Sequence, residues 1–170
     1  MIQKIKHFLF SKKGYKLKKL LIFLTLLSIA SADDGVIKVV YNLTTSNVKS
    51  FEQKILKGIA INKAYYEGNL KELSVAVVIH GGAYKFFLKD LKHTQYANDK
   101  KLLKIFPDLK KRVASLATTY DVDFMVCGVG LKHRKIDTKN VDNFVKVIPN
   151  ASIGLIDRQN EGFAYLNVSD

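Results

Sequence analysis

Residues 73–79 form a nearly continuous apolar run, and this run constrains the fold more than any other feature of the chain. Apolar residues without polar alternation are typical of a strand covered on both faces, as in a parallel sheet. Four further runs of β-branched or apolar residues have strand character, at residues 36–42, 123–127, 145–148 and 163–168. These runs indicate up to five strands, separated by segments with a different periodicity.

Helical patterns fill most of the segments between the runs. From Ser46, a candidate N-cap, apolar residues recur at helical spacing to residue 65. Further helices are expected at residues 83–91, 109–120, 131–135, 140–144 and 151–160. Pro107 is expected to begin the second of these, after a weak pattern over residues 93–106 with one helical turn at 100–105. Five strands alternating with helices predict an α/β fold, with a parallel sheet and helices on both faces.

The first 32 residues have the pattern of a secretory signal peptide. Residues 1–19 carry seven lysines and no acidic residue, residues 20–29 are largely apolar, and Ala30-Ser31-Ala32 is a small-residue cleavage pattern. An uncleaved membrane anchor is the alternative, but the apolar stretch is shorter than the ~20 residues that span a bilayer. We therefore expect cleavage after Ala32, a single domain over residues 33–170, and a periplasmic or secreted protein.

The charge of the chain reflects this leader in large part. The whole chain carries a net charge of +13, and its first 19 residues supply seven lysines without an acid. The remaining lysines are scattered among acidic residues, as on a solvated surface. The charge therefore does not indicate a nucleic-acid partner, and no stable membrane association is expected once the leader is removed.

Cys127 is the only cysteine, and it ends the run at residues 123–127. Gly128-Val129-Gly130 follows at once and predicts a tight turn into a helix. The N–H groups of a helix start and nearby cationic side chains both favour a thiolate. The alternative is that Cys127 is a small buried hydrophobe without chemistry. A lone cysteine allows no internal disulfide and no dithiol mechanism.

A second polar group follows the neighbouring apolar run. His80-Gly81-Gly82 comes directly after residues 73–79, as Cys127 ends the next run. Ligands of parallel α/β sheets bind beyond the carboxyl ends of the strands, which meet at one edge. We therefore expect these two strands to be neighbours and to place His80 and Cys127 on the same edge.

Three segments resemble the DsrE/DsrF-like family, the small sulfur-relay proteins with the YchN-like fold. The segments are residues 77–83, with an apolar strand ending in His-Gly; residues 124–134, with Cys-x-x-x-Leu-x-x-Arg; and residues 153–165, with a Gln-bearing helix and a Gly-aromatic strand. The resemblance covers residues 36–168. It implies a three-layer α/β/α sandwich with a mostly parallel five-stranded sheet, often assembled as a homo-oligomer, a trimer or hexamer.

The resemblance also implies a role for Cys127. In the catalytic members, the cysteine at this position carries a persulfide and passes its outer sulfur to a partner. Under this hypothesis Cys127 is the nucleophile and sulfur carrier, and His80 tunes the thiolate or shuttles a proton. The residues expected to bind the substrate are Gly81, Gly82, Gly128, Val129, Gly130 and Arg134. His80 could instead be satisfied by hydrogen bonds at a strand end, and Arg134 could form a surface ion pair.

Other site classes fit the sequence poorly. Gly128-Val129-Gly130 does not extend to a dinucleotide-binding motif, because His133 stands where the third glycine belongs. The histidines and Cys127 lack a compact chelating spacing, so neither a metal nor a cofactor is expected. The sequence thus predicts an exported sulfur carrier, or sulfurtransferase-like protein, with a sulfur donor or acceptor protein or a small sulfur compound as partner. The alternative is a non-catalytic oligomeric module that binds a small molecule or protein, with Cys127 as core packing.

Overall fold

The computed structural model describes residues 35–170. The predicted signal peptide, its cleavage after Ala32 and the first two residues of the predicted domain lie outside the described residues. Among the described residues, no helix combines the length and the apolar character needed to cross a membrane.

Residues 35–170 form a five-stranded sheet with the order β4-β3-β2-β1-β5, in which all four pairings are parallel. The strands are β1 (Ile37–Leu43), β2 (Leu73–Ile79), β3 (Val122–Cys127), β4 (Val145–Ile148) and β5 (Ala164–Val168). The apolar run at residues 73–79, which predicted a strand covered on both faces, forms the central strand β2. Six of its seven residues are buried. The α/β fold and the parallel sheet are therefore confirmed.

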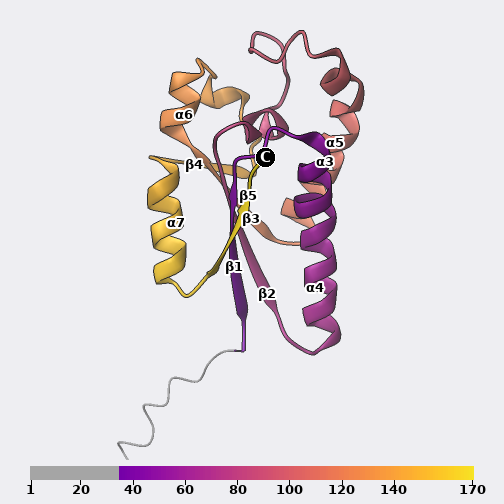
Figure 1. Ribbon diagram of the computed structural model, residues 1–170, viewed down its shortest axis with the longest axis vertical. Helices are drawn as coiled ribbons and strands as arrows, with labels where there is room; N and C mark the ends of the chain where they lie inside the picture. Colours follow the sequence, from indigo (N-terminus) through magenta and orange to yellow (C-terminus); the bar gives the residue numbers. More distant parts are fainter. Residues whose placement is uncertain (1–34) are drawn as a thin grey trace, which may run out of the picture. The chain divides into compact units, whose positions relative to one another are not determined.

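Helices cover both faces of the sheet, as a three-layer α/β/α sandwich requires (Figure 1). They are α3 (Val48–Phe51), α4 (Gly58–Gly68), α5 (Lys100–Thr118), α6 (Gly128–His133) and α7 (Ala151–Asn160). Each strand from β2 to β4 lies next to the one before it, on the same side. The chain then crosses back over the sheet, and β5 pairs with the other side of β1. Because parallel crossovers are right-handed, this reversal places α7 on the face opposite α4 and α5.

The first helix begins one residue later than predicted. Asn47, not Ser46, is the N-cap, and its side chain accepts a hydrogen bond from the Ser50 N–H at 3.1 Å. A π-helical segment, Glu52–Lys57, joins α3 to α4, so that the helical segment is continuous from residue 48 to residue 68. Ser46 is not free to cap the helix because its hydroxyl binds Asp170.

The predicted helix 109–120 is part of a longer one, because α5 begins at Lys100 and contains Pro107 in its interior. The side chain of Asp99 caps it by accepting from the Leu102 N–H at 3.0 Å. Proline costs a helix one hydrogen bond and usually begins or ends it. Here the buried face runs unbroken across the proline, from Leu102 to Leu109 and beyond, and its burial outweighs that loss.

The short helices also differ from the predictions. Residues 83–91 form only a 3₁₀ turn, Ala83–Phe87, because Leu88 is extended and pairs with Val141 in an antiparallel bridge. After Cys127, α6 starts three residues earlier than the predicted turn at 131–135. A 3₁₀ turn at Thr138–Asn140 stands in place of the expected helix 140–144.

Stacked aromatic rings hold the 3₁₀ turn against the helical layer. The rings of Phe51 and Phe86 lie parallel with their centroids 4.1 Å apart, and Phe87 packs 5.1 Å from Phe124 of β3. All four rings are at most 1% exposed. The turn that follows His80 is therefore anchored in the core on both sides.

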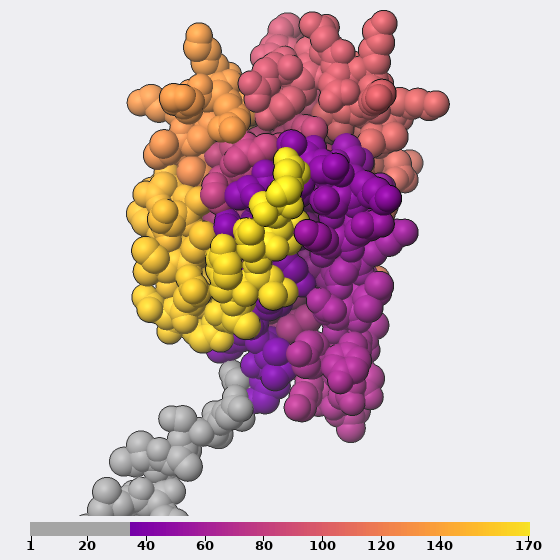
Figure 2. Space-filling view, in the orientation of Figure 1, coloured from indigo at the N-terminus to yellow at the C-terminus, as the bar shows by residue number. Residues whose placement is uncertain are grey.

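Strand β5 is an edge strand that is open to solvent along most of its length. Figure 2 shows the end of the chain at the surface, between α7 and the helical segment that contains α3 and α4. The four residues Ala164–Asn167 are exposed, with Tyr165 and Leu166 each close to 45%. Exposed apolar edge strands are available for association with another chain. The predicted trimer or hexamer stays a prediction.

The carboxylate of Asp170 ties the segment after β5 to the loop after β1. It accepts hydrogen bonds from the Ser46 hydroxyl at 2.7 Å, from the Ser46 and Asn47 N–H groups at 3.1 Å, and from the Thr45 hydroxyl. The Thr45 and Ser46 hydroxyls are the main reasons why the pKa of the Asp170 carboxyl lies well below its usual value of 3.8.

We expect this carboxylate to make stability depend on pH. A carboxyl whose folded pKa is lowered contributes stability above its unfolded pKa, and that contribution is lost as the pH falls through the lower folded pKa. The difference in urea stability between wild type and Asp170→Asn should be constant above about pH 5 and shrink at lower pH. The exposed Glu67→Gln variant is the control. A difference for Asp170→Asn that does not change between pH 3 and pH 7 would contradict this assignment.

Candidate functional site

His80 and Cys127 lie on the same edge of the sheet, as predicted. Strands β2 and β3 are neighbours, and their register pairs Ile79 with Val126. The residues that follow this pair are His80 and Cys127, so the two stand opposite each other where the strands end.

Both side chains belong to the face of the sheet that α7 covers. Val78 contacts this helix, because a Cβ at Gly154 of α7 would lie 3.4 Å from a Val78 methyl group. Successive residues of a strand alternate between the faces, so His80 shares the face of Val78. Met125 is the register partner of Val78, and Cys127, two residues further on, therefore shares this face too.

The imidazole of His80 is half-buried and bound on one side. Its Nε2 lies 2.6 Å from Oδ1 of Asn42 on β1. The pKa of His80 is lowered, first by burial and second by the positive charge of Arg134. The ring is therefore neutral at neutral pH. The backbone N–H of His80 also donates to the Leu43 carbonyl at 3.0 Å. The alternative prediction, that hydrogen bonds at a strand end satisfy His80, therefore holds in part.

Gly81 and Gly82 shape the turn that holds His80. Gly81 has φ +61°, which favours glycine, and a Cβ at Gly82 would lie 2.6 Å from the Cβ of Ser46. The Gly82 N–H donates to the Thr44 carbonyl at 2.8 Å. The two glycines allow the turns after β1 and β2 to pack together, and their predicted role in substrate binding stays a prediction.

Cys127 is the N-cap residue of α6 and is 8% exposed. The N–H of Val129 donates to the Pro149 carbonyl at 3.3 Å, so it does not point to the sulfur as the sequence suggested. A Cβ added at Gly128 would lie 3.0 Å from the Ile148 carbonyl oxygen. The helix-start N–H groups that the sequence predicted around the thiol are therefore only partly available.

Tyr84 is a site residue that the sequence analysis missed. It is 1% exposed, and its hydroxyl donates to the Cys127 carbonyl at 3.2 Å. Burial raises the pKa of Tyr84, and the hydrogen bond and charge of the Cys127 side chain raise it further. No local pattern connects two residues that are 43 positions apart.

Gly130 makes room for the Tyr84 hydroxyl. A Cβ at Gly130 would lie 1.7 Å from the Tyr84 hydroxyl oxygen and 2.7 Å from Cζ. No side chain larger than hydrogen fits this position while Tyr84 stays in place. Gly130 thus supports the site through close packing, which is a different role from the predicted binding of substrate.

Arg134 brings a positive charge to the same group of residues. Its guanidinium carbon lies 4.8 Å from the centre of the Tyr84 ring, and its charge acts on His80. No carboxylate of residues 35–170 forms a salt bridge with Arg134. The surface ion pair considered from the sequence is therefore not formed within the described part of the chain.

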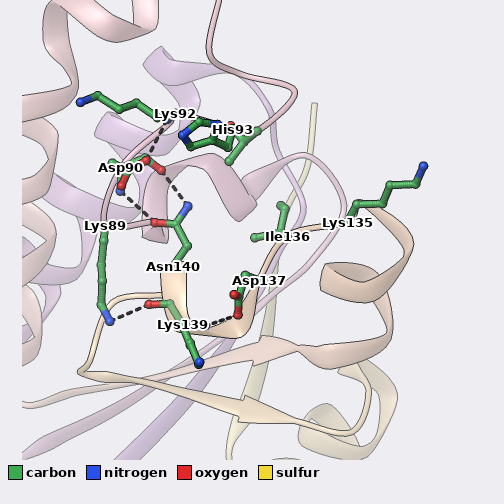
Figure 3. Close-up of a pocket in the computed structure, with 10 residues that line it drawn as sticks. Lys89, Asp90, Lys92, His93, Lys135, Ile136, Asp137, Lys139 and Asn140 are labelled. Carbon is green, nitrogen blue, oxygen red and sulfur yellow. Dashed lines mark hydrogen bonds between the residues drawn. The ribbon is translucent and has the colours of Figure 1, made fainter.

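A cavity in the described part of the chain lies beside this group, not in it. It has a volume of about 420 Å³ and lies between the loop after the 3₁₀ turn and the segment after α6 (Figure 3). Its lining residues are Lys89, Asp90, Lys92, His93, Thr94, Lys135, Ile136, Asp137, Lys139 and Asn140. The side chains of Lys92 and Lys135 point away from it, and Lys89 binds the Lys139 carbonyl at 2.7 Å. None of the predicted site residues lines this cavity.

The chain matches the model of a known protein family over most of its length. The model of the DsrE/DsrF-like family matches residues 8–168. The chain belongs to the DsrE/DsrF-like family. The resemblance of the three sequence segments to this family is thereby confirmed.

Two individual proteins are similar to this DsrE/DsrF-like chain. An uncharacterized protein of Aquifex aeolicus (strain VF5) is 33% identical over 96 residues, which are 56% of this chain and 40% of that protein. The structure of a protein of unknown function, MTH1491 from Methanobacterium thermoautotrophicum, superimposes with a TM-score of 0.54 at 21% identity. That match covers 77% of this chain and 98% of MTH1491, and it supports the three-layer fold.

Proposed function

We propose that this protein carries sulfane sulfur as a persulfide on Cys127. The observation that carries the proposal is the placement of Cys127 at the carboxyl edge of the sheet, where Tyr84 binds its carbonyl and His80 stands opposite it on the neighbouring strand. The DsrE/DsrF-like family supports sulfur relay as the class of function. The persulfide and the role of Cys127 in carrying it are proposals.

The proposed chemistry needs no external oxidant or reductant. The Cys127 thiolate attacks the outer sulfur of thiosulfate, a new sulfur–sulfur bond forms at Sγ, and the bond within thiosulfate breaks. Sulfite leaves with the electron pair of that bond. In the second step the thiolate of an acceptor attacks the outer sulfur of the persulfide, which regenerates the Cys127 thiolate and leaves the persulfide on the acceptor.

The surrounding side chains suit an anionic persulfide. Arg134 has a positive charge without a carboxylate partner in residues 35–170, and it would attract an anionic donor such as thiosulfate. The Tyr84 hydroxyl stays protonated and donates to the Cys127 carbonyl, so it holds the backbone of Cys127 without adding a second negative charge beside the sulfur. His80 is neutral and can accept the thiol proton.

A second candidate function is a binding module without catalysis, with Cys127 as core packing. The observation that favours it is the low exposure of Cys127, 8%, among the buried apolar residues of β3. A thiol that no reagent reaches in the folded protein cannot carry sulfur to a partner.

Intact-mass measurement after incubation with thiosulfate separates the two functions. We expect the wild type to gain one sulfur atom, to lose it again on treatment with dithiothreitol, and Cys127→Ser to gain none. Because Cys127 is the only cysteine, alkylation by iodoacetamide reports on this thiol alone. If the native protein gains no sulfur, and alkylation needs denaturant, the binding module is the better assignment.

The cellular location of the protein and its assembly are also proposals. Export to the periplasm or the outside rests on the leader pattern of residues 1–32, and an exported carrier would exchange sulfur with partners of that compartment. Assembly as a homo-oligomer rests on the family resemblance, and the exposed apolar residues of β5 are compatible with it.

A further inference from the structure

An amide on strand β1 holds the imidazole of His80 in place. Asn42 lies on the face of the sheet that α7 covers, and its Oδ1 is 2.6 Å from His80 Nε2. Its Nδ2 donates to the Tyr165 hydroxyl at 2.8 Å and to Asn167 Oδ1 at 3.1 Å. Both hydrogens of the amide are thus committed to strand β5, which turns the amide oxygen toward the histidine.

This arrangement selects one tautomer of the neutral imidazole. A carbonyl oxygen only accepts hydrogen bonds, so the Nε2 that faces Asn42 Oδ1 must carry the hydrogen. The other ring nitrogen, Nδ1, then has a free lone pair. Strand β1 lies on one side of β2 and strand β3 on the other. Nε2 is therefore bound on the side of β1, and Cys127 stands on the side of β3.

We propose that Asn42 is the positioning residue of the site, which keeps His80 as the Nε2–H tautomer so that Nδ1 accepts the proton of the Cys127 thiol. This inference rests on the proposed function of Cys127 and adds how its thiolate forms. The S–H bond breaks, the proton moves to Nδ1, and the electron pair stays on sulfur for the attack on the donor. The imidazolium keeps its Nε2–H···Asn42 hydrogen bond and returns the Nδ1 proton to solvent.

The chain offers a matched control for this amide. On the opposite face of the sheet, the side chain of Asn62 on α4 donates to the Tyr41 hydroxyl at 3.0 Å. Asn42 and Asn62 thus make the same amide–tyrosine contact, but only Asn42 touches the histidine. Each alanine variant removes one amide–tyrosine hydrogen bond, and only Asn42→Ala should affect His80.

Two measurements on the same proteins test the inference. Long-range ¹H–¹⁵N NMR on histidine-labelled protein, with His80→Gln used for assignment, should give the Nε2–H tautomer in wild type and Asn62→Ala. In Asn42→Ala it should give a mixture of tautomers. Sulfur loading from thiosulfate, followed by intact mass, should slow about tenfold in Asn42→Ala, part of the ~10²-fold that a general base supplies. Loading of Asn62→Ala should match that of wild type.

The outcomes separate the two proposals. A wild type that loads sulfur at the same rate as Asn42→Ala, or whose His80 carries its hydrogen on Nδ1, overturns the role of Asn42 and leaves the persulfide standing. A wild type that gains no sulfur overturns the persulfide, and with it any role of Asn42 in forming it.

Discussion

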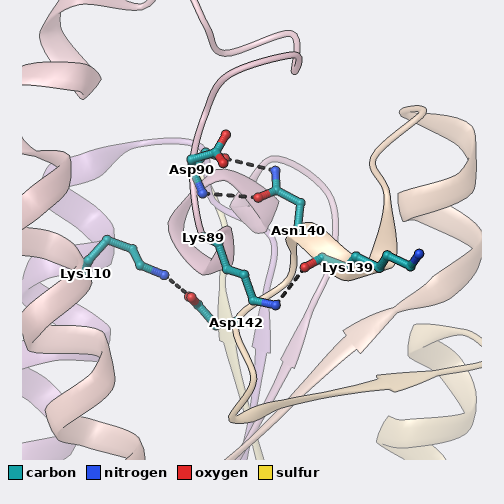
Figure 4. Close-up of polar contacts among 6 residues, drawn as sticks. All are labelled: Lys89, Asp90, Lys110, Lys139, Asn140 and Asp142. Carbon is teal, nitrogen blue, oxygen red and sulfur yellow. Dashed lines mark hydrogen bonds and ion pairs between the residues drawn. The ribbon is translucent and has the colours of Figure 1, made fainter.

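Substitution of Lys110 by methionine should lower the free energy of unfolding by about 3 kcal/mol, because it leaves a buried carboxylate without a counter-charge. Lys110 on α5 forms an ion pair with Asp142, whose side chain is 7% exposed (Figure 4). The second carboxylate oxygen of Asp142 has no hydrogen-bond partner in the described part of the chain. Methionine retains the length and the apolar stem of lysine, so the lost charge dominates the effect.

Urea unfolding at neutral pH measures this loss. Lys111→Met is the control, because Lys111 is the exposed neighbour on the same helix. The double variant Lys110→Met with Asp142→Asn should recover much of the stability, since it removes the unpaired charge as well. If Lys110→Met behaves like Lys111→Met, water screens the pair more than its burial indicates.

The second large effect is expected for Gly130→Ala. An added Cβ at this position would lie 1.7 Å from the Tyr84 hydroxyl oxygen, far inside van der Waals contact. Because Tyr84 is 1% exposed and anchored to the Cys127 carbonyl, it has no free space into which to move. We expect a loss of about 3 kcal/mol, the upper end of typical overpacking effects, together with faster alkylation of Cys127.

Two further variants show whether the tyrosine causes this loss. Gly68→Ala adds a methyl group with no neighbour within 4 Å, so it should not destabilise the protein. Tyr84→Phe in the Gly130→Ala background removes the nearer of the two clashing atoms and should restore part of the stability. If the double variant is no more stable than Gly130→Ala alone, the strain lies in the backbone of α6 and not at the tyrosine.

Local patterns predicted the layout of the sheet well. Strand β2, strand β4 and helix α7 have the predicted bounds, because each is marked by a short apolar run or by a cap and a glycine near its end. The placement of His80 beside Cys127 followed from the same patterns together with the geometry of parallel sheets. These features depend on residues that are close together in the chain.

The missed features depend on residues that are far apart. Asn42 and His80 are 38 positions apart, and Asn42 and Tyr165 are 123 apart, so no local signal marks the amide as part of the site. Tyr84 was hidden among the aromatic residues of a turn that packs into the core. The helix across Pro107 was missed because burial against the sheet, a tertiary effect, outweighed the local signal of the proline.

The return of the chain to β5 has a consequence for the order in which the site can form during folding. Strands β1 to β4 precede β5 in the chain and can pair among themselves, because each of them adjoins the next. The groups that orient the Asn42 amide, Tyr165 and Asn167, belong to the strand that follows these four. A folding intermediate with four paired strands therefore has its thiol and its histidine before the histidine is held in one orientation, and docking of β5 is the step that completes the site.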